Sequence, residues 1–303
     1  MPDLSEFISF VAEKSGVEKA NLIESDILMH RILKLIYSSP HFMENYLFKG
    51  GSCLVKCYFG YYRFSIDLDF TWRNQEIWKV GEKELRRRLL AEIKAFGQLL
   101  ESIAKQSGLE FVNDTKNNRY FEFGGGGRMA TLKLWKGHEL VKIQVNFVEE
   151  LLFPYKKVKV RTLLDGLALS KDEEAYFEEF LNFYKPFEVI AYDEREILCE
   201  KVRAILTRRA QKLRDFYDIL VLENHGFSIE QLSDEIARKI KSALYYRKYR
   251  ENLELNKKAV NFGRGILEDP FERELFVVNP PKNFEKFLAK VLDSLKEIAN
   301  SII

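Results

Sequence analysis

Two short patterns near the start of the chain contain residue types that can do phosphate chemistry. The first is Gly50-Gly51-Ser52, which lies between the apolar run 46–48 and a segment with helix-compatible spacing. Two glycines allow a tight turn and a close approach of the backbone to a ligand, and a helix N-terminus offers unpaired N–H groups to an anion. The pattern predicts a phosphate-binding turn between a strand and a helix, to which the Ser52 hydroxyl can contribute.

The second pattern is the pair Asp67 and Asp69, within a run over residues 64–72 where apolar and polar residues alternate. Alternation with a period of two is typical of a strand, in which residues i and i+2 point the same way. The two carboxylates would then stand side by side as hard oxygen ligands, of the kind that hold Mg²⁺ together with substrate phosphates. Taken singly, the patterns also fit an ordinary turn and a solvated edge strand. Taken together, they favour metal-assisted nucleotide chemistry.

These two runs resemble the Gly-Ser and Asp-x-Asp signature of the DNA polymerase beta-like nucleotidyltransferase superfamily, and within it the AbiEii/AbiGii toxin family. The resemblance implies transfer of a nucleotide from a nucleoside triphosphate that is seated at Gly50, Gly51 and Ser52, with Mg²⁺ as the cofactor held by Asp67 and Asp69. The residues that carry the resemblance are Phe48-Lys49-Gly50-Gly51-Ser52 and Arg63-Phe64-Ser65-Ile66-Asp67-Leu68-Asp69-Phe70.

A second block lies in the C-terminal part of the chain. Residues 194–209 show a helical apolar face with Lys201 and Arg208 on a neighbouring stripe, and the next helix carries Asp215 and Asp218 one turn apart. By spacing alone, this is a solvent-exposed helical hairpin whose acids and bases pair. The block resembles the second characteristic block of the same family, in which a lysine and an aspartate complete the active site. The resemblance implies that Lys201 and Arg208 bind the triphosphate and that Lys201 and Asp215 are catalytic, Asp215 as an additional acid or base.

One strand departs from the superfamily pattern, which usually places a third carboxylate on a later strand of the sheet. The best matching run, 141–147, offers Gln144 and Asn146 instead. A glutamine can hydrogen-bond a ligand but cannot deprotonate an attacking hydroxyl. Glu122, Glu149 or a residue further along can take this place, and the sequence leaves the choice open.

The elements that must position these residues follow from hydrophobic periodicity. We expect helices over 5–14, 25–38 and about 75–105, and strands over 109–112, 119–123, 129–135 and 140–147, with glycines 124–127 as a hairpin turn. Residues 154–165 read as a loop, 171–184 as a helix, 186–191 as a short strand or connector, and most of the remainder as helices. The predicted fold is α+β: a nucleotidyltransferase-type mixed sheet flanked by helices over residues 1–188, followed by a helical C-terminal domain over 189–303 that completes the active-site cleft.

Composition is that of a globular protein, with 46% apolar and 14% aromatic residues among 303. The 48 basic and 46 acidic residues leave a net charge of +2, so attraction for nucleic acid must come from local patches. The best candidate is the basic stretch 238–250, which contains three tyrosines and no acid. Its cations can neutralise phosphates and its tyrosines can stack on bases, although the pattern equally fits a basic helical face whose tyrosines pack inward.

Three cysteines without zinc spacing, the absence of a basic N-terminal leader, and charges inside the apolar run near Ile27 predict a soluble cytoplasmic protein with no membrane segment. The family resemblance implies the toxin of a toxin-antitoxin pair, with a cognate antitoxin and an RNA acceptor, including tRNA. A phosphotransferase that acts on a protein with the same metal site, or an inactive nucleotide-binding module, remains an alternative.

Overall fold

The computed structural model describes residues 2–259 and 267–302. The chain divides into two compact units. The first unit combines Met1–Val148 with Lys156–Ala191, and the second combines Glu149–Tyr155 with Tyr192–Ile303. We describe each unit by itself. The expected domains, with a boundary near residue 188, stay a prediction.

The first unit is built on a seven-stranded mixed sheet with the order β3-β4-β5-β2-β1-β7-β6. In its centre, β2 pairs antiparallel with β1 on one side and parallel with β5 on the other. The predicted α+β class with a mixed sheet is therefore confirmed. The strands are β1 (Tyr46–Lys49), β2 (Asp67–Trp72), β3 (Phe121–Gly124), β4 (Met129–Lys136), β5 (Glu139–Asn146), β6 (Lys156–Val160) and β7 (Phe187–Ala191).

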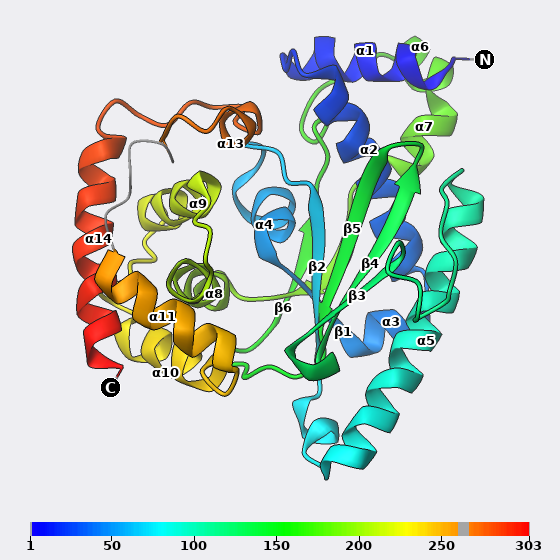
Figure 1. The fold of residues 1–303 in the computed structure, drawn as a ribbon. Helices are drawn as coiled ribbons and strands as arrows, with labels where there is room; N and C mark the ends of the chain where they lie inside the picture. The colour runs from blue at the N-terminus through cyan, green and yellow to red at the C-terminus, as the bar shows by residue number, and fades with distance from the viewer. Residues whose placement is uncertain (1, 260–266, 303) are drawn as a thin grey trace. The chain divides into compact units, whose positions relative to one another are not determined.

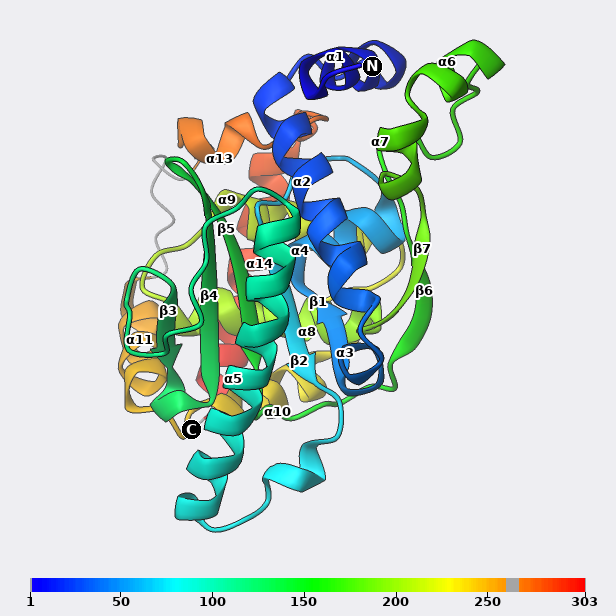
Figure 2. The same ribbon diagram turned by 90° about the vertical axis from the view of Figure 1, so that its right-hand side faces the viewer.

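Helices cover both faces of this sheet (Figures 1 and 2). On one face lie α2, α3 and α5, and on the other lies the short helix α4. Leu68 and Phe70 of β2 and Ile143 and Val145 of β5 are completely buried, so the alternate residues of these strands form the core. The helices of the unit are α1 (Leu4–Ser15), α2 (Ala20–Tyr37), α3 (Pro40–Asn45), α4 (Gly50–Cys53), α5 (Glu82–Gln106), α6 (Lys171–Tyr176) and α7 (Glu178–Phe183).

Several local predictions were wrong. Residues 109–112 form no strand, and only Glu110 makes an isolated bridge, to Trp135, because the chain turns away immediately afterwards. The expected loop 154–165 contains β6, an edge strand whose three lysines hide its β signal and protect the open edge. The long helix α5 begins only at Glu82, after the 3₁₀ turn Gln75–Trp78.

The second unit is helical, as expected. Its helix α8 packs against α9, α10, α11 and α14, and α13 packs against α9. Burial of every third or fourth residue along α14 follows its apolar stripe, which confirms that this helix docks on the rest of the unit. The helices are α8 (Glu194–Thr207), α9 (Leu213–Asn224), α10 (Ser233–Ala243), α11 (Arg247–Ala259), α13 (Pro270–Glu274) and α14 (Phe284–Ser301).

None of the helices in the described part of the chain is long and apolar enough to span a membrane.

A buried charged cluster ties α2 to the segment that follows α4. The Lys56 ammonium lies 2.6 Å from an Asp26 carboxylate oxygen, and both side chains are at most 3% exposed. The Tyr61 and Tyr184 hydroxyls donate to the other Asp26 oxygen at 2.9 and 2.8 Å. Lys56 lies on the π-helix Leu54–Phe59, which continues directly from α4. The cluster therefore anchors the helical segment that follows the Gly-Gly-Ser turn.

Asp26→Asn should therefore lower the free energy of unfolding by about 3–5 kcal/mol, since it leaves the Lys56 charge buried and uncompensated. Urea unfolding followed by circular dichroism measures this. The double variant Asp26→Leu/Lys56→Met serves as the control and should recover much of the loss, because it removes both charges. A single variant within about 1 kcal/mol of the parent would show that the pair is not energetically coupled.

Candidate active site

The Gly-Gly-Ser turn lies directly against the second aspartate. Gly50 has a φ of +76°, and a Cβ added to it would lie at most 3.0 Å from three Asp69 side-chain atoms, the nearest being Oδ2. Backbone conformation and close approach both require glycine here. The cause lies in the sheet, where Lys49, the last residue of β1, pairs with Asp69 of β2. Strand pairing therefore brings the predicted phosphate-binding turn and the predicted metal ligand together.

Gly51 packs against a buried cation that sequence reasoning missed. A Cβ at this position would collide with Nη2 of Arg63, and Ser65 Oγ lies 3.3 Å from the same point. Arg63 is almost completely buried, and its Nη1 donates to the Phe64 carbonyl at 2.7 Å. Arg63 lies within the motif that carries the family resemblance, but only the folded chain shows that its guanidinium lies beneath the turn.

The Ser52 hydroxyl is used inside the protein. Ser52 is buried, and its Oγ donates a hydrogen bond to the backbone carbonyl of Asp67. This bond connects the helical segment after the turn with the first residue of β2. It therefore positions the aspartates, whereas a contact between Ser52 and a nucleotide stays a prediction.

Asp67 and Asp69 are half-buried and flank the buried Leu68 on β2. They point to the face opposite the core, side by side, as the alternation predicts. One alternative interpretation is wrong, because β2 lies between β1 and β5 in the middle of the sheet and is not a solvated edge strand. A central strand holds its side chains in a fixed register, which favours a preorganised pair of ligands.

The register also defines the place of the missing carboxylate. Gln144 of β5 lies directly opposite Asp69 on the neighbouring strand. This is the position at which the superfamily resemblance led us to expect a third carboxylate. Glu122 lies in the same lateral row, two strands beyond Gln144. At a strand spacing of about 4.8 Å, Glu122 is roughly 14 Å from Asp69, too far for both to bind one ion. Glu122 instead pairs with Lys133 at 2.9 Å.

The described residues contain no group of three or more His, Cys, Asp or Glu side chains that could hold a metal ion. Asp67 and Asp69 thus form a two-carboxylate site at most. This donor set fits Mg²⁺, which is usually bound through one or two carboxylates together with waters and substrate phosphates.

The second block forms a compact ion cluster inside the second unit. The Lys201 ammonium lies 2.6 Å from Asp215 Oδ1 and 2.6 Å from Asp218 Oδ2. Arg208 is not on the helical stripe that we expected, because α8 ends at Thr207 and Arg208 is extended, yet its Nη1 lies 3.2 Å from Asp215 Oδ2. Acids and bases therefore pair, as spacing alone suggested. The hairpin is not solvent-exposed, however, since the side chains of Asp215, Asp218 and Lys201 are only 5%, 0% and 12% exposed.

Burial by itself raises the pKa of the Asp215 carboxyl, but the positive charges of Lys201 and Arg208 and the hydrogen bond from Lys201 outweigh it. The net effect is a pKa well below the ordinary value of an aspartate. Asp215 is therefore ionised at neutral pH and has no proton to donate. Of the two roles that the resemblance implies, that of a base fits this pKa better than that of an acid. The structure adds a third role, because the hydrogen bond from Lys201 lets Asp215 orient that ammonium.

Part of the basic stretch 238–250 is not a surface. Lys239 is only 1% exposed and lies 3.2 Å from Glu149 and 2.6 Å from Glu196, so its assignment to an RNA-facing surface was wrong. Arg238 pairs with Glu150 at 2.6 Å. Glu149 and Glu150 come from residues 149–155, a segment that sequence reasoning did not place beside this stretch, and Glu196 comes from α8. Glu149 also accepts a hydrogen bond from Tyr192, so this candidate for the third carboxylate is already engaged.

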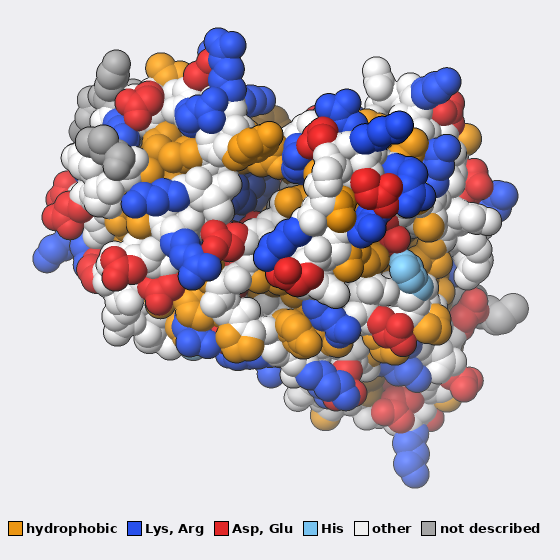
Figure 3. All heavy atoms as spheres, turned by 90° about the horizontal axis from the view of Figure 1, so that it is seen from below, with side chains coloured by type: hydrophobic (Ala, Val, Ile, Leu, Met, Phe, Trp, Pro, Cys, Tyr) orange, Lys and Arg blue, Asp and Glu red, His pale blue; other side chains and the backbone are white. Residues whose placement is uncertain are grey.

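The rest of the stretch consists of the end of α10, a turn over 244–246 and the start of α11. Tyr245, in the turn, is 72% exposed, whereas Tyr249 packs over the partly buried Arg203, with 5.9 Å between its ring centroid and the guanidinium carbon. Arg247 pairs with Glu251. On the face drawn in Figure 3, basic and acidic side chains are interspersed, in agreement with the balanced composition.

The chain matches a known protein family over most of its length. Residues 31–299 match the family model described as Nucleotidyl transferase AbiEii toxin, Type IV TA system, where TA stands for toxin-antitoxin. The match includes the Gly-Gly-Ser turn, the aspartate pair and the Lys201 cluster. No curated protein matches the chain.

Gly50→Ala should lose at least about tenfold in nucleotide transfer, because a Cβ there displaces the Asp69 carboxylate. Gly60→Ala is a matched control: its φ is +77°, but nothing lies within 4 Å of the added Cβ. Both variants carry backbone strain because both glycines have a positive φ, and urea unfolding should show a loss of about 1–3 kcal/mol in each. Equal transfer rates in the two variants would contradict a role for the contact with Asp69.

The depressed pKa of Asp215 predicts a pH-dependent contribution to stability. Its ionised form stabilises the folded chain fully above the unfolded pKa of about 3.9, and this stabilisation is lost as the pH falls through the lower folded pKa. Asp215→Asn should therefore lower the free energy of unfolding by up to about 3 kcal/mol at pH 7 and by much less near pH 2. Asp293→Asn, which alters an exposed aspartate of α14, should show no such difference. A pH-independent effect of Asp215→Asn would contradict the ion cluster.

Proposed function

This chain belongs to the nucleotidyl transferase AbiEii toxin family of type IV toxin-antitoxin systems, and we propose that it transfers a nucleotide to an RNA in a reaction that depends on Mg²⁺. The family makes it a nucleotidyltransferase and a toxin, with a nucleoside triphosphate as substrate and a cognate antitoxin as partner. The proposal concerns the acceptor, the metal and the residues that do the chemistry.

The observation that carries the proposal is the contact between Gly50 and the Asp69 carboxylate. A turn that can seat phosphates is useful for nucleotide transfer only if the metal ligands lie beside it. Strand pairing between Lys49 and Asp69 supplies that proximity, and the Ser52 hydroxyl fixes the start of β2 relative to the turn.

In the proposed reaction, Gly50, Gly51 and Ser52 seat the triphosphate, and a hydroxyl of the acceptor attacks the α-phosphorus. A new bond forms between the acceptor oxygen and the α-phosphorus, the bond from the α-phosphorus to the bridging oxygen breaks, and pyrophosphate leaves. Asp67 and Asp69 would hold Mg²⁺, and the ion would supply positive charge that neutralises the phosphates in the transition state.

Four cations of the chain complement this charge in the proposal. Arg63 lies beneath the turn and makes the nearby backbone more attractive to an anion. Lys201 and Arg208 bind the triphosphate, and Lys201 is suited to this because a flexible ammonium can follow a phosphate through the reaction. Lys49, buried at the end of β1, adds a fourth positive charge next to Asp69.

The glutamine at position 144 limits how the acceptor is activated. Its amide cannot accept the proton of the attacking hydroxyl, and Asp215 is a weak base because its pKa is depressed. Phosphoryl transfer through a loose transition state needs little help from a base, since positioning and electrostatic stabilisation supply most of the rate. We therefore assign the rate enhancement chiefly to the turn, the aspartates and the cations.

An RNA end, with tRNA as the first candidate, is the proposed acceptor. Beyond the family itself, support comes from the part of the stretch 238–250 that remains at the surface. Tyr245 can stack on a base, and the exposed Lys241 and Lys248 can contact phosphates.

The test is to incubate the protein with total RNA, Mg²⁺ and each α-labelled nucleoside triphosphate in turn. We expect a labelled band of tRNA size that disappears with a chelator and falls by about 10³-fold in Asp67→Ala and Asp69→Ala. Asp172→Ala, which alters an exposed aspartate of α6, is the matched control and should retain full labelling.

The same assay with γ-labelled triphosphate tests for phosphotransfer. If the acceptor is labelled by the γ-phosphate and not by the α-phosphate, the protein is a phosphotransferase and the proposal is rejected. Labelled protein without labelled RNA would reject the RNA acceptor. Full activity of Asp69→Ala would reject the assigned metal ligands.

A further inference from the structure

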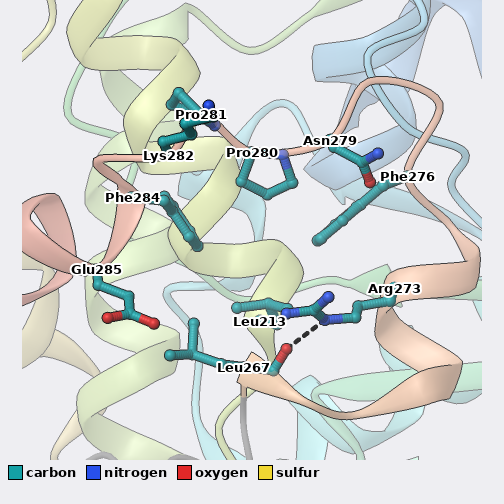
Figure 4. Close-up of a pocket in the computed structure, with 10 residues that line it drawn as sticks. All are labelled: Leu213, Leu267, Arg273, Phe276, Asn279, Pro280, Pro281, Lys282, Phe284 and Glu285. Atoms are coloured by element: carbon teal, nitrogen blue, oxygen red, sulfur yellow. Dashed lines mark hydrogen bonds between the residues drawn. The ribbon is translucent and has the colours of Figure 1, made fainter.

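The second unit contains a pocket of about 280 Å³ at the N-terminal end of α9. Its walls come from α9, from the segment that includes α13, and from the residues leading into α14. Figure 4 shows Phe276 and Phe284 projecting into the pocket from opposite sides, with Leu213 and Arg273 along another wall. The volume is close to the lower end of the roughly 300–1,000 Å³ that is typical of small-molecule sites, which suits one nucleoside-sized group.

The aromatic walls are held in place before any ligand arrives. The Tyr217 ring packs against Phe276 and Phe284, with centroids 4.9 and 6.0 Å apart. The Tyr217 hydroxyl donates to the Val278 carbonyl at 2.9 Å, which fixes the loop after Phe276. Both phenylalanines are at most 5% exposed, so only a small part of each ring faces the pocket and the packing around the rings holds them in place. Preorganised walls of this kind favour binding because little conformational freedom is lost.

Polar and charged side chains also line the pocket. Arg273 and Lys282 bring two positive charges, Asn279 brings an amide, and Glu285 brings one negative charge. Arg273 is steadied by a hydrogen bond from its Nε to the Leu267 carbonyl, and its remaining guanidinium N–H groups can serve a ligand. The exposed part of the two phenylalanine rings can contact a planar base, the Asn279 amide can hydrogen-bond the edge of that base, and a net charge of +1 matches one phosphate better than a triphosphate.

The pocket is also connected to the candidate catalytic cluster. Leu213, which lines it, is the first residue of α9, and Asp215 lies in the same helical turn. Arg214 between them pairs with Glu272 of α13 at 2.5 Å, and its backbone N–H donates to the same carboxylate at 3.1 Å. A ligand in the pocket would therefore contact the same helical turn that presents Asp215 to Lys201.

We infer that this pocket is a second nucleotide site, which binds the base and phosphate of a single nucleotide and is separate from the Gly-Gly-Ser turn. In the proposed function, the pocket would hold one nucleotide of the RNA acceptor, and this role rests on that proposal. The binding of a single nucleotide in the pocket is independent of the proposed function.

The test is a binding titration of the full chain, without Mg²⁺, followed by ligand-observed NMR. The probes are AMP, CMP, GMP and UMP, with adenosine and inorganic phosphate as partial ligands. We expect at least one monophosphate to bind more tightly than either partial ligand. Lys282→Gln and Phe276→Leu should each weaken that binding by about tenfold, since each removes one contact and keeps most of the side-chain volume. Lys286→Gln, which removes an exposed charge from the first turn of α14, should leave monophosphate binding unchanged.

Gly50→Ala separates the pocket from the Gly-Gly-Ser turn, because a Cβ at this position displaces the turn from Asp69 and needs no metal to act. Monophosphate binding that is lost in Gly50→Ala but kept in Lys282→Gln and Phe276→Leu would place the nucleotide at the turn and overturn the inference. If inorganic phosphate binds as tightly as the monophosphates, the pocket is only an anion site. If adenosine binds as tightly as the monophosphates, the pocket recognises only the base and sugar. Either result also overturns it.

Binding of short single-stranded oligoribonucleotides tests whether the pocket holds a nucleotide of an RNA chain or a free nucleotide. Tighter binding of an oligonucleotide than of the free monophosphate, with the same sensitivity to Lys282→Gln, supports a site for the acceptor, whereas weaker binding overturns that role. If α-label never reaches RNA but the pocket variants still weaken monophosphate binding, the proposed function fails and the second site stands.

Discussion

The close contact between Gly50 and the Asp69 carboxylate is the constraint on which the candidate site depends. It exists because β1 and β2 pair so that Lys49 lies opposite Asp69, and because the chain turns out of the sheet at the next residue. Any side chain at Gly50 would force the turn away from the strand. The core of the first unit maintains this arrangement from behind, since Leu68 and Phe70 anchor β2 between β1 and β5. The apolar residues that alternate with the aspartates are thus as necessary to the site as the aspartates themselves.

Buried charged groups also shape both units. Two lie near the Gly-Gly-Ser turn, and two more lie in the helical unit. Asp26 with Lys56 and the Arg63 guanidinium hold the segments around the turn. In the second unit, Lys201 and Lys239 each lie among two or more carboxylates. Such clusters add little net stability compared with apolar packing, but breaking them is costly. Their effect is to specify geometry, which is what a site for a highly charged substrate requires.

Sequence reasoning reached the parts of the structure that have a local signal. The alternation around Asp67 and Asp69 fixed their common face, and the glycines before Ser52 indicated the turn, because both patterns follow from backbone geometry within a few residues. The structure also shows what no local pattern contains. Arg63 beneath Gly51, Lys239 among glutamates, and the return of residues 149–155 to the second unit all depend on contacts between distant segments. The strand β6 was missed for a different reason, since an edge strand protected by lysines resembles a polar loop.

The replacement of a carboxylate by Gln144 changes the electrostatics of the candidate site more than its shape. Strand register still places this side chain opposite Asp69, so position 144 remains a neighbour of any ion that Asp69 holds. Two carboxylates beside the buried cations Lys49 and Arg63 leave little net negative charge at the site, and a divalent ion alone is then weakly attracted. A nucleoside triphosphate supplies the missing negative charge and the missing oxygen ligands together. In the proposed reaction, binding of the metal would therefore depend on the nucleotide, and Gln144 would make that dependence stronger than a third carboxylate would.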